Sequence, residues 1–226
     1  MNKLATNAQA IFKVLYPHSA LHIKFASIFE FLSDNPENAQ YLKGMSIDDE
    51  SFIVRMCHRF VKGRKEFPPS IPDTIPDTMI DVVLENYYSV ARDELRTASV
   101  YHRYSMGAEN IIGNLLEFYI ASEAEKNDWV WCSGQFVKAI DFLRKQPSGS
   151  NKWEMLQVKN RDNSENSSSS AVRNGTEIKK WFRTFSRTGN TNWENYPDVT
   201  LKQRLSEEGF ICFVKAYLKR LTPTEV

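Results

Sequence analysis

Four residues in the middle of the chain have the types and spacing of a metal-assisted hydrolytic site: Glu117, Asp141, Gln157 and Lys159. Gln157 and Lys159 are two positions apart, so on a strand both side chains leave the same face. Magnesium prefers hard oxygen ligands and is held by one or two carboxylates together with substrate phosphates. We therefore expect Asp141 to be the primary metal ligand, with Gln157 and Glu117 as further ligands.

Lys159 completes the catalytic candidates because its amine can orient or deprotonate an attacking water, or offset charge that builds on a phosphate. Gln157 can bind the metal through its amide oxygen, or the backbone carbonyl beside it can do so. A bound divalent ion lowers the pKa of water and stabilises developing charge. These residues together predict hydrolysis of phosphodiesters.

Glu117 has a second interpretation, because it is embedded in an apolar run. A carboxylate there is costly unless it is paired or binds a cation. An ion pair with a neighbouring lysine or arginine is therefore the alternative to a catalytic role. Glu109, two turns earlier, is the reserve candidate.

A helix followed by three strands must position these side chains. Apolar spacing over residues 111–120 predicts a buried helix that begins at residues 105–109 and contains Glu117. Strands are expected over residues 129–132, 136–143 and 153–161, and the last two form a hairpin. In the third strand Leu156 and Val158 face the core; Glu154 shares their face and is therefore not a candidate.

The chain divides into a helical N-terminal region, residues 1–104, and a catalytic core, residues 105–226. A proline-rich linker over residues 67–78 interrupts the helical half. Basic residues are dense over residues 55–65, where a solvated helix face is favoured over phosphate contact. For residues 210–218 a strand and a helix are equally compatible with the pattern.

The bulk composition indicates a folded protein of the cytoplasm. The chain has 226 residues, of which 42% are apolar and 25% charged, with a formal net charge of +1. Three widely separated cysteines form neither a zinc pattern nor a disulfide framework, which is typical of a reducing compartment. No apolar run reaches membrane-spanning length, and the N-terminus lacks the apolar core of a signal peptide, so no membrane association is expected.

A polar segment, residues 160–190, follows the third strand directly. One interpretation is a disordered linker; the other is a DNA-reading segment, because arginine pairs with guanine and asparagine with adenine. A helix is expected over residues 176–187, with its N-terminus towards phosphate. Seven basic side chains against three acids over residues 159–187 give +4. The expected DNA contacts are Arg161, Asn163, Asn166, Ser168, Arg173, Asn174, Lys179, Lys180 and Arg183.

The order Asp141, then Gln157-Val-Lys159, resembles the PD-(D/E)XK nuclease superfamily, in which an acid on one hairpin strand precedes acid-X-Lys on the next. Glu117 matches the glutamate that many of these nucleases carry on a helix. Gln157 replaces the second acid, and Ile140 replaces the proline; Glu165 could supply the missing carboxylate. The resemblance implies an α/β (α+β) fold with a central mixed sheet flanked by helices.

The residues from Leu156 to Thr176, followed by Ile178-Lys-Lys-Trp181, are similar to the SinI (AvaII-like) family of type II restriction endonucleases. Gly113-Asn-Leu-Leu-Glu117 is similar too. The resemblance implies magnesium-dependent cleavage of double-stranded DNA at GGWCC (W is A or T), and protection of bacterial host DNA by a cytosine methyltransferase. A palindrome is read by two copies related by a two-fold axis, so a homodimer is expected.

Two other functions remain open at this stage. A structure-specific repair or junction nuclease would keep the fold and change the substrate. A catalytically decayed, sequence-specific DNA-binding protein would account for Gln157 in place of an acid. A plain interaction domain would leave Asp141, Lys159 and the polar segment as coincidence.

Overall fold

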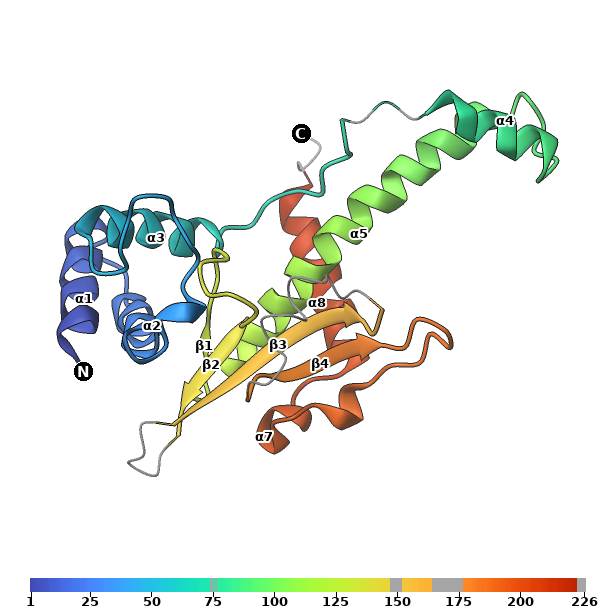
Figure 1. Ribbon diagram of the computed structural model, residues 1–226. Helices are drawn as coiled ribbons and strands as arrows, with labels where there is room; N and C mark the ends of the chain where they lie inside the picture. Colours follow the sequence, from blue (N-terminus) through green and yellow to red (C-terminus); the bar gives the residue numbers. More distant parts are fainter. Residues whose placement is uncertain (74, 76, 147–151, 164–176, 223–226) are drawn as a thin grey trace.

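The computed structural model describes residues 1–73, 75, 77–146, 152–163 and 177–222. It shows a four-stranded mixed sheet with helices on both sides (Figure 1). One hydrophobic cluster joins one face of the sheet to the N-terminal helices, and a second joins the other face to the long central and C-terminal helices. The α+β fold with a central mixed sheet, predicted from the sequence, is confirmed.

The sheet has the order β1-β2-β3-β4. Its strands are β1 (Val130–Trp131), β2 (Phe142–Lys145), β3 (Trp153–Arg161) and β4 (Lys179–Thr184). The β1–β2 and β2–β3 pairs are antiparallel, whereas β3 and β4 are parallel. The predicted third strand and its hairpin with the second are therefore confirmed. Leu156 and Val158 enter the cluster with the central helix, while Met155 packs on the opposite side, as alternation requires.

Three helices of the N-terminal region share the hydrophobic cluster on one face of the sheet: α1 (Lys3–Leu15), α2 (His22–Asp34) and α3 (Glu50–Lys62). The short η1 (Pro36–Asn38) follows α2. Phe25 and Phe60 reach Phe136, from the segment before β2, with ring centroids 6.1 and 6.4 Å away. These aromatic contacts join the helical region to the loop that leads into the hairpin.

The central helix, α5 (Leu95–Ala124), begins ten residues earlier than the predicted start at residue 105. Gly107, in the stretch predicted to open the helix, lies inside α5, where close packing requires a glycine. A β-carbon there would lie 2.8 Å from the carbonyl oxygen of Ser70, so the glycine permits the linker to cross α5 closely. The boundary between residues 104 and 105 therefore falls inside one continuous helix. α4 (Thr78–Asn86) precedes it.

The second strand is shorter than predicted: β2 starts at Phe142, and residues 136–140 lead into it as a loop. Gln135 and Ala139 have φ angles of 56° and 58°, which extended backbone does not allow. Phe136 and Lys138 instead form backbone hydrogen bonds with Gln40 and Asn38. Tertiary contact with the N-terminal region thus overrides the strand pattern.

The helix predicted over residues 176–187 is wrong, because Lys179–Thr184 forms β4. Pairing with the open edge of β3 supplies backbone partners that a helix pattern does not reveal. Trp181 is buried against the central helix cluster as a result.

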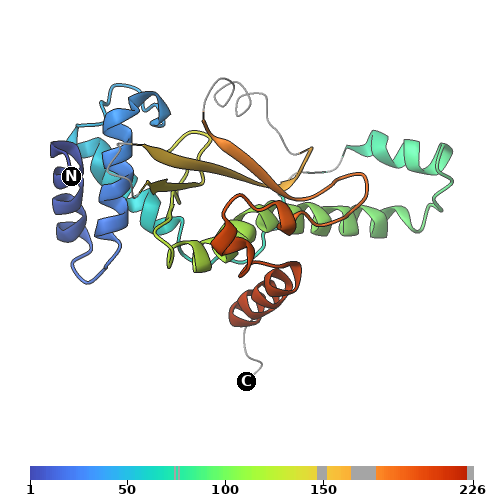
Figure 2. The same ribbon diagram turned by 90° about the horizontal axis from the view of Figure 1, so that it is seen from below.

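The C-terminal part covers the second face of the sheet with η2 (Trp193–Asn195), α7 (Val199–Lys202) and α8 (Glu207–Leu221). Residues 210–218, for which two structures were open, are helical. Ser206 caps α8 by accepting a hydrogen bond from the Gly209 amide. Figure 2 shows α8 beside α5, beneath the sheet. In the part of the chain that the structure covers, no helix combines the length and apolar character needed to cross a membrane.

Candidate active site

One cleft of about 860 Å³ is lined by all four of the catalytic candidates, Glu117, Asp141, Gln157 and Lys159. Three segments far apart in the sequence form its walls: the end of α3 with the linker after it, the middle of α5, and the loop between β1 and β2. β3 contributes Gln157 and Lys159 from one face. The structure therefore brings together the side chains that the sequence singled out.

Asp141 lies immediately before β2 and is held by three hydrogen bonds, two with β3 and one with the residue that follows β1. Its Oδ2 accepts from the Val158 amide at 2.6 Å, its own amide donates to the Leu156 carbonyl, and its carbonyl accepts from the Cys132 amide. Burial raises the pKa of Asp141, while the Val158 amide and the charge of Lys159 act in the opposite direction. The carboxylate is thus fixed in direction and enclosed by protein.

Glu117 reaches the same cleft from the middle of α5. Among the described residues its hydrogen-bond partner is the indole of Trp131, whose Nε1 donates to Oε2 at 2.9 Å, rather than a lysine or arginine. Burial raises the pKa of Glu117 above its usual range, and the negative charge of Asp141 raises it further. The Trp131 hydrogen bond and the charge of Lys159 oppose this rise. The negative charge of Asp141 therefore makes ionisation of Glu117 less favourable.

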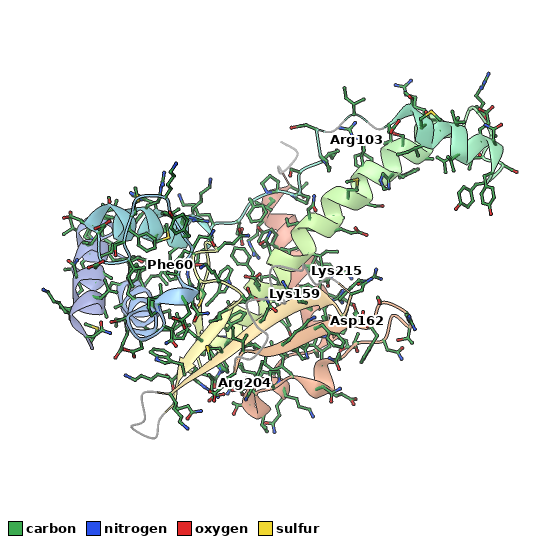
Figure 3. All side chains as sticks on the ribbon, viewed as in Figure 1. Phe60, Arg103, Lys159, Asp162, Arg204 and Lys215 are labelled. Atoms are coloured by element: carbon green, nitrogen blue, oxygen red, sulfur yellow. The ribbon has the colours of Figure 1, made fainter. Side chains whose placement is uncertain are left out.

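Gln157 and Lys159 leave the same face of β3, as their spacing of two residues predicts. Gln157 is only 2% exposed, whereas Lys159 is half-buried. Figure 3 shows Lys159 on the sheet beside the middle of α5. Its positive charge lowers the pKa of both carboxylates, so its ammonium group lies within electrostatic reach of Asp141 and Glu117.

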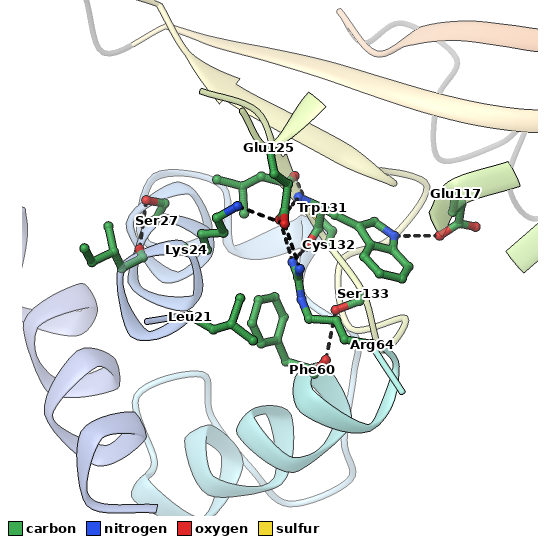
Figure 4. A network of polar contacts seen from close by, with 12 residues as sticks. Leu21, Lys24, Ser27, Phe60, Arg64, Glu117, Glu125, Trp131, Cys132 and Ser133 are labelled. Carbon is green, nitrogen blue, oxygen red and sulfur yellow. Dashed lines mark hydrogen bonds and ion pairs between the residues drawn. The ribbon is translucent and has the colours of Figure 1, made fainter. Parts of the chain in front are cut away.

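A network of polar contacts lies beside the cleft and reaches it through Trp131 and Glu117 (Figure 4). Glu125 accepts two hydrogen bonds from Arg64, at 2.8 and 2.9 Å, and pairs with Lys24 at 2.8 Å. Arg64 also donates to the Trp131 carbonyl, and the Trp131 amide donates to Glu125. Trp131 is thereby fixed through its backbone while its indole reaches Glu117. The network connects the N-terminal helices to a site carboxylate.

Basic side chains rim the cleft, and two of them come from the N-terminal region. Arg59 and Lys62, on the last turn of α3, line it together with Lys138 from the loop before β2. The dense basic residues over residues 55–65 favour a solvated helix face by pattern alone, but two of them line the cleft in the structure. No sequence signal pointed to Trp131, which aligns Glu117. The N-terminal region therefore contributes charge to the site.

The residues expected to contact DNA lie in different parts of the structure, and some lie outside the described residues. Arg161 and Asn163 are exposed at and just beyond the end of β3, and Lys179 is exposed at the start of β4. Lys180 pairs with Gln157 and so shares its face of the sheet. Arg183 lies on the opposite face, where it contacts Glu207 and Asn160. Glu165, Asn166, Ser168, Arg173 and Asn174 lie outside the described residues.

The donor set of the cleft fits a hard divalent cation. Within the described residues, no three or more His, Cys, Asp or Glu side chains converge on one point. The cleft does hold two enclosed carboxylates whose pKa values are raised, and a cation offsets that kind of unfavourable burial. Oxygen donors from Glu117, Asp141 and Gln157 are the type that magnesium takes.

The mixed sheet, the paired acids and the neighbouring lysine are the features of a nuclease-like α+β protein. The family model of the SinI restriction endonuclease matches residues 5–220, and the chain belongs to this family. Its match extends through the helical half, which lies outside the residues on which the resemblance was based. The predicted relationship to SinI-type restriction endonucleases is confirmed.

Two characterised relatives are similar over most of their length. The type II restriction enzyme Eco47I of Escherichia coli is 42% identical over 205 residues, covering 89% of each chain. The type II restriction enzyme SinI of Salmonella infantis is 43% identical over 201 residues, covering 89% of this chain and 86% of the relative. The similarity therefore includes both the helical region and the residues that line the cleft.

Proposed function

We propose that this protein is a type II restriction endonuclease that hydrolyses both strands of double-stranded DNA at a short palindrome, with magnesium as cofactor. The meeting of Asp141, Glu117 and Lys159 in one cleft is the observation that supports this most directly. Membership of the SinI family favours site-specific restriction over a repair or junction activity.

Asp141 and Glu117 are the residues proposed to hold magnesium, with the amide oxygen of Gln157 or a backbone carbonyl beside it as a further ligand. When bound, the ion lowers the pKa of water and stabilises charge that develops on the phosphate. The Val158 amide and the Trp131 indole keep the two carboxylates directed into the cleft. Fixed ligands of this kind need no rearrangement when the ion arrives.

Lys159 is proposed to act on the reacting groups. From its place beside both carboxylates, its amine can orient or deprotonate the attacking water, or offset charge on the phosphate. Arg59, Lys62 and Lys138 on the rim can neutralise phosphates of the approaching duplex. The cleft therefore presents positive charge at its mouth and carboxylates within.

Base recognition is assigned to the segment over residues 160–190. Its proposed contacts are Arg161, Asn163, Asn166, Ser168, Arg173, Asn174, Lys179 and Lys180. Arg183 is left out of this set, since its contacts with Glu207 and Asn160 tie β4 to the helical layer. Helices α1 to α3 of the N-terminal region, whose Arg59 and Lys62 line the cleft, are proposed to clamp the duplex from the opposite wall.

The proposed site is GGWCC, which rests on the sequence resemblance described above. A palindrome of this kind is cut in both strands by a homodimer, one cleft for each strand. The corresponding biological context is a bacterial cytoplasm in which a cytosine methyltransferase protects the host's own copies of the site.

Cleavage of unmethylated phage DNA in the presence of magnesium tests the proposal. Discrete fragments whose ends map to GGWCC are expected, and DNA methylated at that site should resist. A smear of products, or cutting directed by junctions, would favour a non-specific or structure-specific nuclease. Binding without any cutting would identify a decayed enzyme.

Variants test the assignment of residues. Asp141→Ala and Lys159→Ala are each expected to reduce cleavage at least about a thousandfold, while duplex binding in calcium stays within a few-fold of normal. Asp34→Ala, an exposed acid on α2, serves as the control and should cut normally. Full activity of Asp141→Ala would disprove its role as a ligand.

A further inference from the structure

The proposed chemistry does not explain the surface of the helical arm, defined as residues 77–104. The arm consists of α4 and the first part of α5, and it projects from the body on the side away from α1 to α3 (Figures 1 and 2). Its base is anchored by Arg103 (labelled in Figure 3), which donates to the Pro72 carbonyl at 3.0 Å. Gly107 also permits close contact with Ser70.

Nine large apolar or aromatic side chains of the arm are between 39% and 78% exposed, including Met79, Val83, Tyr87, Tyr101 and Tyr104. α4 has no buried residue. A helix of nine residues is marginal in water unless an apolar face is covered. The exposed side chains therefore indicate a surface that is covered in the working protein.

The apolar residues follow helical spacing rather than being scattered. On α4, Met79, Val82 and Val83 stand at positions i, i+3 and i+4, and on α5 Val100 and Tyr104 are four residues apart. Residues with this spacing share one side of a helix. Each helix of the arm thus presents an apolar stripe of the kind that normally packs against another protein surface.

The area of this surface is sufficient for a stable interface. Taking roughly 200 Å² for a whole tyrosine side chain and less for the aliphatic ones, the exposed part of the nine amounts to roughly 800 Å². The largest apolar patch on a typical monomer measures about 300–600 Å². A stable protein–protein interface buries about 800 Å² on each partner.

The charge of the arm argues against DNA or an anionic membrane as its partner. Three arginines stand against five acids over residues 77–104, which gives a formal charge of −2. Phosphate-bearing partners are held by lysine and arginine and are repelled by an acidic surface. The basic rim of the cleft serves that purpose elsewhere in the molecule. A protein surface remains as the fitting partner.

We infer that the helical arm is the surface through which two copies of this chain pair. The inference rests on the proposed function in one respect: cutting both strands requires two clefts related by symmetry. α5 carries Tyr104 at the arm and Glu117 at the cleft, 13 residues apart, which is about 20 Å at 1.5 Å per residue. Pairing through the arm therefore sets the position of each cleft through one continuous helix.

The test measures the oligomeric state of the full-length protein by analytical ultracentrifugation, without DNA or metal. Wild type is expected to be a dimer at micromolar concentration. The double variant Val83→Asp with Tyr101→Asp should dissociate at least 100-fold more readily, while its circular dichroism spectrum still shows a folded protein. A second pair, Met79→Lys with Tyr104→Lys, repeats the test in case the first does not fold.

The matched control is Val14→Asp with Tyr41→Asp, whose side chains lie outside the arm and are 81% and 73% exposed. This control should remain dimeric. A monomeric wild type, or folded arm variants that stay dimeric, would overturn the inference. Since pairing is measured without cleavage, an inactive but arm-dependent dimer would refute only the proposed function. If the enzyme is active, the arm variants should nick plasmid DNA instead of linearising it.

Discussion

The indole Nε1 of Trp131 donates a hydrogen bond of 2.9 Å to Oε2 of Glu117, across the floor of the cleft. The carbonyl of Trp131 accepts from Arg64 and its amide donates to Glu125, so the backbone that carries the indole is fixed on both sides of the Trp131 α-carbon. The hydrogen bond stabilises the ionised form of Glu117 against the effects of burial and of Asp141. Trp131 is therefore a positioning residue.

Trp131→Phe should reduce cleavage about 10- to 100-fold, because a hydrogen bond to a charged group contributes about 1.5–3 kcal/mol. Loss of this donor raises the pKa of Glu117 further, so part of the activity should return at higher pH. Single-turnover cleavage across a pH series measures both effects. Trp129→Phe is the control, because the Trp129 indole donates to Asp198 at 3.0 Å and does not line the cleft. The pH profile of this variant should match that of wild type.

Glu117→Gln should stabilise the metal-free protein at pH 8. A carboxyl whose pKa is raised by folding binds more protons in the folded state, so stability falls as pH rises from its ordinary pKa towards the raised one. Glutamine still accepts from Trp131 but carries no charge. We expect a melting temperature a few degrees higher, given about 2–4 °C per kcal/mol for a chain of this size.

The advantage of Glu117→Gln should shrink as the pH falls towards the ordinary pKa of glutamate, where both proteins are neutral at this position. Thermal melts in EDTA at several pH values provide the measurement. Glu109→Gln, an exposed acid on the same helix, should change little. A wild type more stable than the variant at pH 8 would contradict the raised pKa.

Gly134→Ala should destabilise the protein by about 2–4 kcal/mol. Gly134 has a φ of +90°, and a β-carbon there would lie 2.6 Å from the Arg59 carbonyl group. The loop carrying Cys132 to Asp141 would then separate from α3 and open the cleft. Denaturant unfolding gives the loss directly, and cleavage should fall with it.

Gly113→Ala is the contrasting substitution. It lies within α5 with open space around its β-carbon position, so alanine should stabilise the helix by about 0.5–1 kcal/mol. If both substitutions changed the free energy of unfolding equally, close packing would not be the reason that position 134 requires a glycine.

Glu125→Gln should cost about 2–4 kcal/mol at neutral pH, because it leaves Arg64 without its charged partner in a largely buried site. Burial alone would raise the pKa of Glu125, but the hydrogen bonds and charge of Arg64, and then those of Lys24, lower it overall. The stabilisation is thus present above the ordinary glutamate pKa and is lost as pH falls through the lowered one.

Chemical denaturation of wild type and Glu125→Gln at neutral and acid pH tests this, and the difference should shrink in acid. The control is Glu123→Gln, near the end of α5, whose partners Lys126 and Arg204 are 62% and 49% exposed. A surface pair of this kind contributes little, so its loss should stay below about 0.5–1 kcal/mol at every pH.

Local pattern was sufficient for the core of the site. Alternation along β3 placed Leu156 and Val158 inward and Gln157 with Lys159 together, because side chains on a strand repeat every two residues wherever the strand lies. The apolar run of α5 marked Glu117 as an acid in an unusual environment. Fold class and family followed from these residues and the stretch that comes after them.

Tertiary contact decided the rest. Residues 179–184 became β4 because the edge of β3 offers backbone partners, and residues 136–140 form a loop because the N-terminal region binds them instead. Arg59 and Lys62 joined the cleft, and Trp131 met Glu117, through contacts between segments far apart in the chain. Periodicity reports only the preferences of neighbouring residues, whereas burial, strand pairing and the pKa of a carboxyl depend on what folding places beside them.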